Sequence, residues 1–498
     1  MGWLAWFALV PLLLGISGRS VKYGFLVSGI CGITFFTGFF SWLFEVRSYN
    51  LFHHALLGVL YLGPLFGIFG LLYGRITRRW GLTPALCAAP FIWVSLEYIR
   101  ANFFFLAIPS AIIGHTQYQH PLIIQFVSVT GDYGLSFLIV WVNAAITAAI
   151  LRLLHGGYLK PACAPPAKSG TIAMLSVTAA MIGVALLYGQ MTLSRSVGQQ
   201  EIKVSVLQGN IEQAKKWDPK FARAIMSTYL DLSKAASKDQ PALIVWPEAA
   251  TPGLVLKKMG LLKQARELIR QTRTHYLIGS SEYPKFQKAA ADQHKTSNSA
   301  LFFSPDGKVL GQYLKIRLFP FAEYVPYEKT FRWPEFIVPA ERRRSHVAGK
   351  EFNLFEINGA KFGTVICWEI AFPGVFRKFV KNGADFMINI TNEAWFRESS
   401  YPYQYVAISV LRAVENRVSI ARAANTGISC FIDPFGRVTA KLQDENGKDL
   451  FIKGYLTRNI ALSPQKTFYT TYGDVFVYLV LIITAAVLII TFLKRSSR

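Results

Sequence analysis

Long apolar runs separated by short basic connections fill the first 200 residues, and one more lies near the end of the chain. A helix crosses a hydrocarbon core of about 30 Å with roughly 20 mainly apolar residues. The pattern therefore predicts seven membrane-spanning helices, near residues 2–17, 23–44, 55–74, 84–106, 122–151, 171–190 and 473–493. The first run is as short as the apolar part of a signal peptide, but it lacks a basic start and a small-residue cleavage site, so we expect a retained helix.

From residue 201 onward, short apolar strands alternate with amphipathic helices. Strands are expected at 202–207, 242–246, 276–280, 301–303, 361–366, 385–390 and 429–432, and helices at 221–236, 261–274 and 402–416. This alternation is typical of an α/β layered domain with sites at strand ends. We expect a six-helix membrane domain at 1–193, a catalytic domain at 194–470, and a final membrane helix with a basic tail at 471–498.

Basic residues mark alternate connections between the predicted helices. Lys and Arg collect in cytoplasmic loops, and here they are Arg19, Lys22, Arg75, Arg78, Arg79, Arg152, Lys160, Lys168, Lys494, Arg495 and Arg498. The other connections hold only Arg47 and the helix-end Arg100. The N-terminus and the segment from about 195 to 470 are therefore predicted to lie outside, which in a bacterium is the periplasm.

Composition agrees with a membrane protein: 52% of the 498 residues are hydrophobic, and mean hydropathy is +0.31. Residues 1–200 hold 11 basic and three acidic residues, so they contribute +8 of the formal +24. An exported domain between membrane helices seldom meets nucleic acid, which favours anionic headgroups as the partner of this charge. A solvated basic face without a partner remains the alternative.

Five cysteines make an odd, low count that does not suggest a disulfide framework. Cys31 and Cys87 fall in predicted membrane helices, and Cys163 falls in a predicted cytoplasmic loop. A single disulfide between Cys367 and Cys430 is the alternative to a reactive Cys367.

Cys367 ends the β-rich run 361–366 and opens a different pattern, so its thiol is expected at a sharp strand-to-helix turn. Glu248 ends the apolar run that starts at Leu243, and Lys315 follows another short run. A thiol needs a base or cation to become a nucleophile, and a fixed cation stabilises an oxyanion. The three residues therefore predict an acyl-transfer site, with an ordinary Glu–Lys ion pair as the alternative.

Five ordered motifs carry a family resemblance: Gln208-Gly-Asn210 with Lys216-Trp217-Asp218, Trp246-Pro-Glu248, Lys315 with Pro320-Phe-Ala-Glu-Tyr-Val-Pro326, Ile366-Cys-Trp-Glu369, and Asn392-Glu-Ala-Trp-Phe396. Together with Gly114-His-Thr-Gln117 and Gly131-Asp-Tyr-Gly-Leu-Ser-Phe137, they resemble the apolipoprotein N-acyltransferases. These enzymes are the membrane-bound members of the nitrilase superfamily. The resemblance covers nearly the whole chain.

The resemblance implies a polytopic helical membrane domain and an external α/β nitrilase-like domain, an αββα sandwich. It implies a ping-pong enzyme of the bacterial inner membrane, with its catalytic domain in the periplasm. An acyl chain would move from a phospholipid, typically phosphatidylethanolamine, through a Cys367 thioester to the α-amino group of a diacylglyceryl-cysteine apolipoprotein. This is the final step of lipoprotein maturation, and it uses no metal or other cofactor.

Further site residues also follow from the resemblance. Glu323 is expected to orient Lys315 or the incoming amine. Glu369 is expected either to do the same or to act as an ordinary helix-dipole partner, and Trp368 stands where a tyrosine is common. Pocket-lining or supporting positions are Trp217, Asn298, Trp395, Arg412 and Asn425, for which core packing is the alternative.

Seven aromatic residues follow Lys315 within a proline-containing stretch: Phe319, Phe321, Tyr324, Tyr327, Phe331, Trp333 and Phe336. Aromatic rings concentrate at membrane interfaces. We expect a lid that rests on the bilayer beside Cys367, with a second small hydrophobic core as the alternative.

In the membrane half, Glu97 and Arg100 are spaced to neutralise each other on one helix. Intramembrane ionisable residues are otherwise candidates for function. His115, Gln117 and Asp132 are candidates for headgroup contact.

Some features depart from the family pattern. Its members commonly have eight membrane helices and begin inside, so either this chain starts late or it lacks the first helix. Ala322 replaces a glycine, and Tyr405 follows Gln404 where a histidine is usual. Two rival functions stay open: a membrane-tethered amidase that delivers its acyl-enzyme to water, and a non-catalytic lipid-binding protein.

Overall fold

The computed structural model describes residues 2–46, 49–155, 164–195, 198, 200–257, 259–284, 295–338, 346–462 and 465–493. The chain divides into two compact units, residues 1–195 with 472–498 and residues 196–471. Some residues used for the orientation and cysteine predictions lie outside the described residues: Arg47, Lys160, Cys163, Lys494, Arg495 and Arg498.

The first unit is helical. Its elements are η1 (Gly2–Trp6), α1 (Val10–Ile16), α2 (Val21–Phe39), η2 (Ser41–Glu45), α3 (Leu51–Leu57), the π-helical turn η3 (Gly58–Leu62), α4 (Gly63–Trp80), α5 (Leu82–Asn102), η4 (Phe104–Leu106), η5 (Ile113–Gln117), α6 (Pro121–Ile124), α7 (Val127–Thr130), α8 (Asp132–His155), α9 (Lys168–Leu193) and α16 (Val475–Leu493). Within the described residues, six helices are long and apolar enough to cross a membrane: α2, the continuous run Leu51–Trp80, α5, α8, α9 and α16.

Six of the seven predicted spans therefore contain a helix of spanning length, and the first, which the sequence already marks as short, does not. The segment Gly2–Ile16 is too short and is broken between η1 and α1. Asn143 of α8 binds both sides of this break: its Oδ1 accepts from the Leu9 N–H at 2.8 Å, and its Nδ2 donates to the Ala5 carbonyl at 2.9 Å. A buried side chain thus satisfies backbone groups that a continuous helix would pair internally.

The predicted span 122–151 also begins later than expected. Gly131 has a φ of +69°, which a helix cannot contain, so α7 ends there and α8 starts at Asp132. The ten residues Pro121–Thr130 form only short helices.

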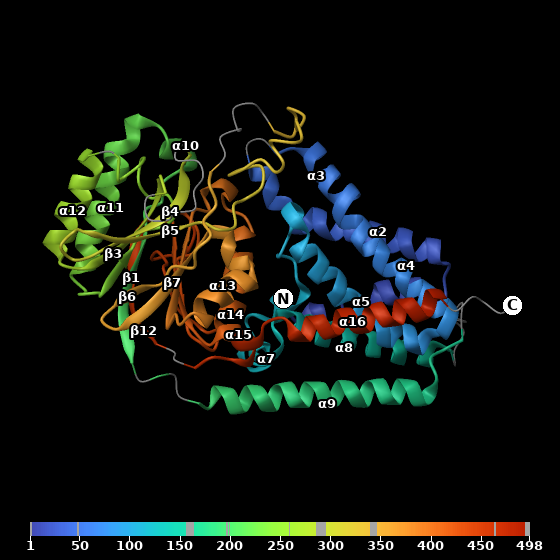
Figure 1. The fold of residues 1–498 in the computed structure, drawn as a ribbon. Coiled ribbons are helices and arrows are strands. Elements are labelled where there is room, and N and C mark those ends of the chain that lie inside the picture. The colour runs from blue at the N-terminus through green and yellow to red at the C-terminus, as the bar shows by residue number, and fades with distance from the viewer. Residues whose placement is uncertain are drawn as a thin grey trace. The chain divides into compact units, whose positions relative to one another are not determined.

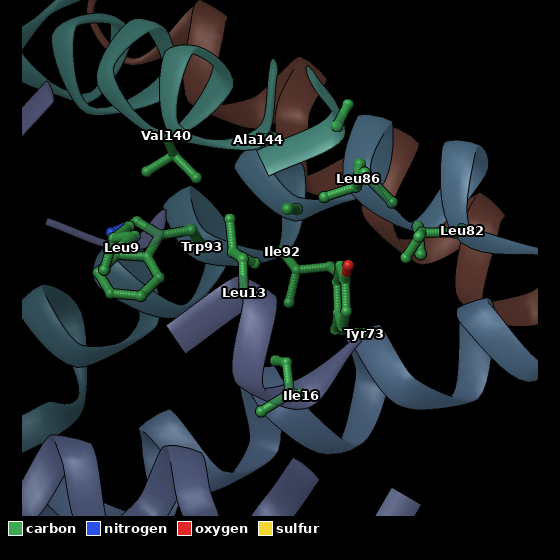
Figure 2. Close-up of a cluster of buried hydrophobic side chains, with 14 of the residues drawn as sticks. Leu9, Leu13, Ile16, Tyr73, Leu82, Leu86, Ile92, Trp93, Val140 and Ala144 are labelled. Atoms are coloured by element: carbon green, nitrogen blue, oxygen red, sulfur yellow. The ribbon is translucent and has the colours of Figure 1, made fainter. Parts of the chain in front are cut away.

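A buried apolar cluster holds the helices of this unit together (Figure 2). Leu13 and Ile16 of α1, Tyr73 of α4 and Ile92 of α5 belong to it, together with Val140 of α8. The short first segment is therefore part of the helical core.

Glu97 and Arg100 both bind the segment that follows α5. The Glu97 carboxylate accepts from the Ile113 N–H at 2.9 Å. The Arg100 guanidinium donates to three carbonyls, those of Ile108, Ser110 and Ala111. Both side chains therefore hold this irregular segment through its backbone, whereas the mutual neutralisation of their charges stays a prediction.

The candidates for headgroup contact also have partners inside the unit. His115 Nε2 lies 3.0 Å from Asp132 Oδ2, and Gln117 Nε2 donates to the Gly2 carbonyl at 2.7 Å. Contact with a headgroup stays a prediction.

The second unit contains two six-stranded sheets. Its strands are β1 (Glu201–Gln208), β2 (Leu243–Val245), β3 (His275–Glu282), β4 (Ser297–Phe303), β5 (Val309–Leu314), β6 (Phe355–Ile357), β7 (Ala360–Ile366), β8 (Phe386–Thr391), β9 (Ser419–Ala424), β10 (Cys430–Ile432), β11 (Val438–Lys441) and β12 (Gly454–Ala461). Their order is β12-β1-β2-β3-β4-β5 in one sheet and β11-β10-β9-β8-β7-β6 in the other.

Helices cover the outer faces of the two sheets (Figure 1). They are α11 (Ala222–Ser237) and α12 (Met259–Thr272) on the first sheet, and α13 (Pro373–Lys381) and α14 (Tyr401–Asn416) on the second. Between the sheets, Phe302 of β4 packs edge-on against Phe362 of β7 with ring centroids 5.4 Å apart. The unit is an αββα sandwich, which confirms the predicted fold class.

Parallel strands place their C-terminal ends at one edge of each sheet. β1, β2 and β3 are parallel in the first sheet, and β7, β8 and β9 are parallel in the second. Functional residues of open parallel sheets gather at such edges, and here Glu248, Cys367, Asn392 and Asn425 all follow these strand ends closely.

The disulfide alternative is not realised. Cys367 and Cys430 are both free, and Cys430 is fully buried in β10. Cys31 and Cys87 are also free thiols in the first unit.

Candidate active site

Cys367 stands directly after β7 and opens the short helix η8 (Cys367–Ala371). Its φ of +55° is rare for a residue with a side chain, so this is the sharp turn that the sequence predicts. Such a backbone persists only when surrounding contacts hold it, and it often marks a functional position. Burial, followed by the charge of Glu248, raises the pKa of the Cys367 thiol to about 12, whereas the charge of Lys315 opposes that rise.

Glu248 lies just beyond β2 and is 6% exposed. Its Oε1 accepts from Asn298 Nδ2 at 2.6 Å and from Lys315 Nζ at 3.4 Å. Its Oε2 accepts from the Asn392 N–H at 2.7 Å. Donors from three strand ends therefore fix the carboxylate in one orientation.

Lys315 follows β5 and is 1% exposed. Its Nζ donates to Glu323 Oε1 at 2.9 Å, closer than Glu248 at 3.4 Å. Burial disfavours the ammonium, but the two carboxylates outweigh burial and hold the pKa of Lys315 above its ordinary value. The lysine is therefore a permanent cation in a site that water reaches poorly.

Glu323 completes a buried cluster with Glu248, Lys315 and Asn298. Asn298 Nδ2 donates to Glu323 Oε1 at 2.9 Å as well as to Glu248, and the Phe319 N–H donates to Glu323 Oε2 at 2.7 Å. Burial opposes ionisation, but the Lys315 charge and these hydrogen bonds lower the pKa of Glu323. The structure thus joins four of the predicted residues, with Cys367 within the electrostatic reach of three of them.

Glu369 connects the Cys367 turn to the segment after Lys315. Its carboxylate accepts from the Ile366 N–H at 2.8 Å, from the Ile316 N–H at 2.7 Å and from the Arg317 N–H at 2.9 Å. The Tyr313 hydroxyl also donates to it, at 2.9 Å. The bond from Ile366 is a capping contact at the start of η8, which agrees with the helix-terminus alternative. The bonds from Ile316 and Arg317 add a second role, because they hold the loop after β5 to the Cys367 turn.

Trp368 is also buried between these loops. Its Nε1 donates to the Arg317 carbonyl at 2.6 Å, and its ring packs against Phe319 and Phe372 with centroids 4.7 and 4.8 Å away. It supports the backbone that carries Lys315.

Besides Asn298, described above, the predicted pocket residues fall into three groups. Asn425 donates to Asn392 Oδ1 at 2.9 Å, and Asn392 in turn binds Glu248, so Asn425 supports the site without contacting Glu248 in the described bonds. Trp217 and Trp395 are 53% and 43% exposed and free to meet a ligand. Arg412 is fully buried in α14, 2.7 Å from Glu415, as the core-packing alternative expects.

The aromatic segment after Lys315 is not a closed second core. Tyr327, Phe331 and Phe336 are each more than half exposed. Trp333 packs edge-on against Phe331 and Phe321 and donates from Nε1 to the Pro326 carbonyl at 2.6 Å. The segment therefore has a small internal contact and an exposed apolar surface.

Two residues beside Glu248 do not appear among the sequence candidates. Asn392 supplies the backbone N–H described above, and Lys216 Nζ donates to the Glu248 carbonyl at 3.0 Å. Both belong to motifs that carry the family resemblance, and Asn392 directly follows the predicted strand 385–390. Among the described residues, no group of three His, Cys, Asp or Glu side chains is placed to hold a metal ion.

Both units of the chain match known protein families. Residues 203–461 match the carbon-nitrogen hydrolase family, and residues 1–145 match the apolipoprotein N-acyltransferase N-terminal domain. Among solved structures, an amidase from Nesterenkonia sp. aligns over 57% of this chain and 95% of its own, with 17% identity and a TM-score of 0.39.

Similar whole-length relatives carry one name. The apolipoprotein N-acyltransferase of Geobacter metallireducens is 34% identical over 99% of this chain and 92% of its own length. Those of Chlorobaculum tepidum and Haemophilus influenzae are 27% and 28% identical, each over 95% of this chain and 88% of their own. With this agreement along its length, the chain belongs to the apolipoprotein N-acyltransferase family of membrane enzymes.

Proposed function

We propose that Cys367 is the nucleophile, Glu248 the general base and Lys315 the oxyanion-stabilising cation of an apolipoprotein N-acyltransferase. The single observation that supports these roles best is the buried cluster around Glu248. It holds a carboxylate, a permanent cation and a strained cysteine turn at neighbouring strand ends.

In the first half-reaction, Glu248 takes the proton of the Cys367 thiol, and the sulfur attacks the ester carbonyl of a phospholipid. Once Glu248 is protonated, its negative charge no longer opposes the Cys367 thiolate, and the positive charge of Lys315 still favours the thiolate. The tetrahedral oxyanion faces Lys315. The C–O bond then breaks, the leaving alkoxide takes the proton from Glu248, and lysophospholipid departs from a Cys367 thioester.

In the second half-reaction, the neutral α-amino group of a diacylglyceryl-cysteine apolipoprotein attacks the thioester carbonyl. Glu248 accepts a proton from the nitrogen, and the C–S bond breaks to release the Cys367 thiolate. Transfer of that proton to sulfur restores the enzyme, and the product carries an amide.

Other residues have supporting roles. Glu323 orients Lys315, Glu369 and Trp368 hold the loops of Cys367 and Lys315, and Asn298 fixes both carboxylates. Trp217 and Trp395 contact substrate, and Asn425 steadies the Asn392 loop. The burial of Arg412 favours a structural role in place of substrate contact.

Family membership makes this a membrane enzyme that acts on apolipoproteins and phospholipids. We take phosphatidylethanolamine as the donor, and the bacterial inner membrane with a periplasmic catalytic domain as the location. In this proposal, residues 194–470 form the catalytic domain, flanked by membrane segments at 1–193 and 471–498.

The fate of the acyl group tests this function against a tethered amidase. Purified protein would receive phosphatidylethanolamine and a diacylglyceryl lipopeptide, and N-acylated peptide, lysophospholipid and free fatty acid would be quantified together. We expect equal amounts of acylated peptide and lysophospholipid, with little free acid. Free acid as the main product would support hydrolysis, and normal acylation by Cys367→Ala would exclude the proposed nucleophile.

A further inference from the structure

The three charged residues Glu248, Glu323 and Lys315 together carry a net charge of −1 when all are ionised. Glu248 and Glu323 both bind Lys315 Nζ, so two carboxylates share one ammonium. Glu323 is the closer partner and already compensates Lys315. A buried site with a net charge of −1 would oppose both thiolate and oxyanion formation, because screening by water is weak there.

Other buried charged groups nearby do not supply the missing cation. Arg422 binds Glu393 and Asn389, so its charge is compensated by Glu393. Glu369 is held by backbone N–H groups and by Tyr313, without an ion pair to a cation among the described contacts.

Lys216 lies on the other side of Glu248, at the end of the short helix α10 (Gln213–Lys216). It is 2% exposed, and its Nζ donates to the Glu248 carbonyl at 3.0 Å. Among the described residues, no carboxylate forms an ion pair with it. A buried ammonium without its own counter-ion is unusual, and functional sites are where such groups concentrate.

The position of α10 is tied to the same site by a second contact. Gln213 lies one turn before Lys216, and its Oε1 accepts from Asn392 Nδ2 at 2.9 Å. Asn392 in turn donates its backbone N–H to Glu248 Oε2. One face of α10 therefore contacts both the carbonyl of Glu248 and the residue that orients its carboxylate.

Burial lowers the pKa of Lys216 to about 8, whereas the charges of Glu248 and Cys367 favour its protonated form. At neutral pH it is therefore mostly an ammonium. Lys315 and Glu323 are the remaining charged members of the cluster, and they bind each other.

We propose that Lys216 is a positioning residue for Glu248 and supplies the second positive charge of the catalytic cluster. This inference rests on the proposed function of Cys367 and Glu248. With Lys216 protonated, Glu248, Glu323, Lys315 and Lys216 sum to zero. The sum stays zero when the Cys367 proton moves to Glu248, and again when the negative charge passes from sulfur to the carbonyl oxygen of the ester.

The test is the pH dependence of acyl-enzyme formation in the full-length protein. Wild type, Lys216→Met, Lys216→Gln and Lys216→Arg would be mixed with phosphatidylethanolamine alone in detergent micelles. Intact mass would then follow the adduct over time between pH 5.5 and 9. Lys215→Met is the matched control, because Lys215 is the adjacent residue and its side chain is 46% exposed in a surface ion pair with Glu212.

Loss of one buried charge beside the base should slow acylation at pH 7 by roughly 10- to 100-fold. It should also move the fall in rate at acidic pH up by about one pH unit, because a nearby positive charge favours the ionised form of a carboxylate and would be lost. The Arg variant should keep the wild-type fall at acidic pH even if its overall rate is lower, and Lys215→Met should match wild type. The Gln variant repeats the neutral test if the Met variant fails to fold, which thermal unfolding would reveal.

The proposal would be overturned if a folded Lys216→Met or Lys216→Gln variant lost activity at the same acidic pH as wild type. It would also be overturned if Lys216→Arg shifted the acidic side of the profile as far as Lys216→Met does. Those results would leave the proposed function intact, because wild type would still form the adduct. Absence of an adduct in folded wild type would instead contradict the proposed function itself.

Discussion

Replacement of Glu369 by glutamine tests how the two catalytic loops are held. The Glu369 carboxylate accepts N–H groups from Ile316 and Arg317 on one side and from Ile366 on the other. Both oxygens of the carboxyl can accept, even when one is protonated, whereas the NH₂ group of glutamine cannot accept and would face a backbone N–H. Leaving one buried N–H unsatisfied destabilises a protein by about 1–3 kcal/mol, so we expect Glu369→Gln to be less stable than wild type at pH 5.

The size of this difference should depend on pH. Burial raises the pKa of Glu369 from 4.5 to about 7, although its hydrogen bonds oppose the rise. An acid with a raised folded-state pKa gives its full stabilisation below the unfolded pKa and loses it as pH rises through the folded pKa. Between pH 4.5 and 7 the free energy of unfolding of the wild type should therefore fall by about 3 kcal/mol through this residue. The Glu369→Gln variant should not show this fall, because glutamine has no proton to lose.

Thermal unfolding of wild type and Glu369→Gln in the same detergent, at pH 5 and pH 8, would measure this effect. Glu356→Gln on the exposed side of β6 is the matched control. The gap between wild type and Glu369→Gln should be clear at pH 5 and nearly closed at pH 8. Acylation by the variant should fall about 10- to 100-fold, since small displacements of reacting groups have effects of that size. A gap of equal size at both pH values would refute the titration of Glu369 in this range.

Three further predictions concern the site and its surroundings. Glu248→Gln should lower the rate of Cys367 acylation by about 100-fold or more, measured by intact mass, because the buried thiol loses its base; a rate near wild type would contradict the role of Glu248. Lys315→Met should lower that rate by about 100- to 1,000-fold with little change in phospholipid binding, as expected for a group that acts on the oxyanion. Combined Phe331→Ser and Trp333→Ser changes should reduce acylation of substrate in a bilayer while sparing detergent-dispersed substrate, and equal loss in both would exclude a membrane-resting lid.

The sequence predicts the fold class and much of the site because strand ends are local signals. The turn at Cys367 follows from the break after the apolar run 361–366, and Glu248 follows from the end of the run 243–246. Family motifs then add Glu323 and Asn298, which the structure joins to Lys315.

Features that depend on distant contacts are harder to predict. Nothing in the local pattern shows that Lys216 contacts the carbonyl of Glu248, since a lysine at the end of a short polar helix is usually solvated. Likewise, the break in the first helix depends on Asn143, more than 130 residues away in the chain. The burial of Arg412 depends on its neighbour Glu415 and on the packing of α14, which a single arginine in a sequence does not reveal.

The most direct test of the central claim is the mass of the enzyme after incubation with phosphatidylethanolamine alone. We predict an acyl adduct that hydroxylamine removes, that maps to Cys367, and that moves to the amine when a diacylglyceryl lipopeptide is added. A folded enzyme that forms no adduct, or one that carries it at another residue, would contradict the assignment of Cys367 as the nucleophile.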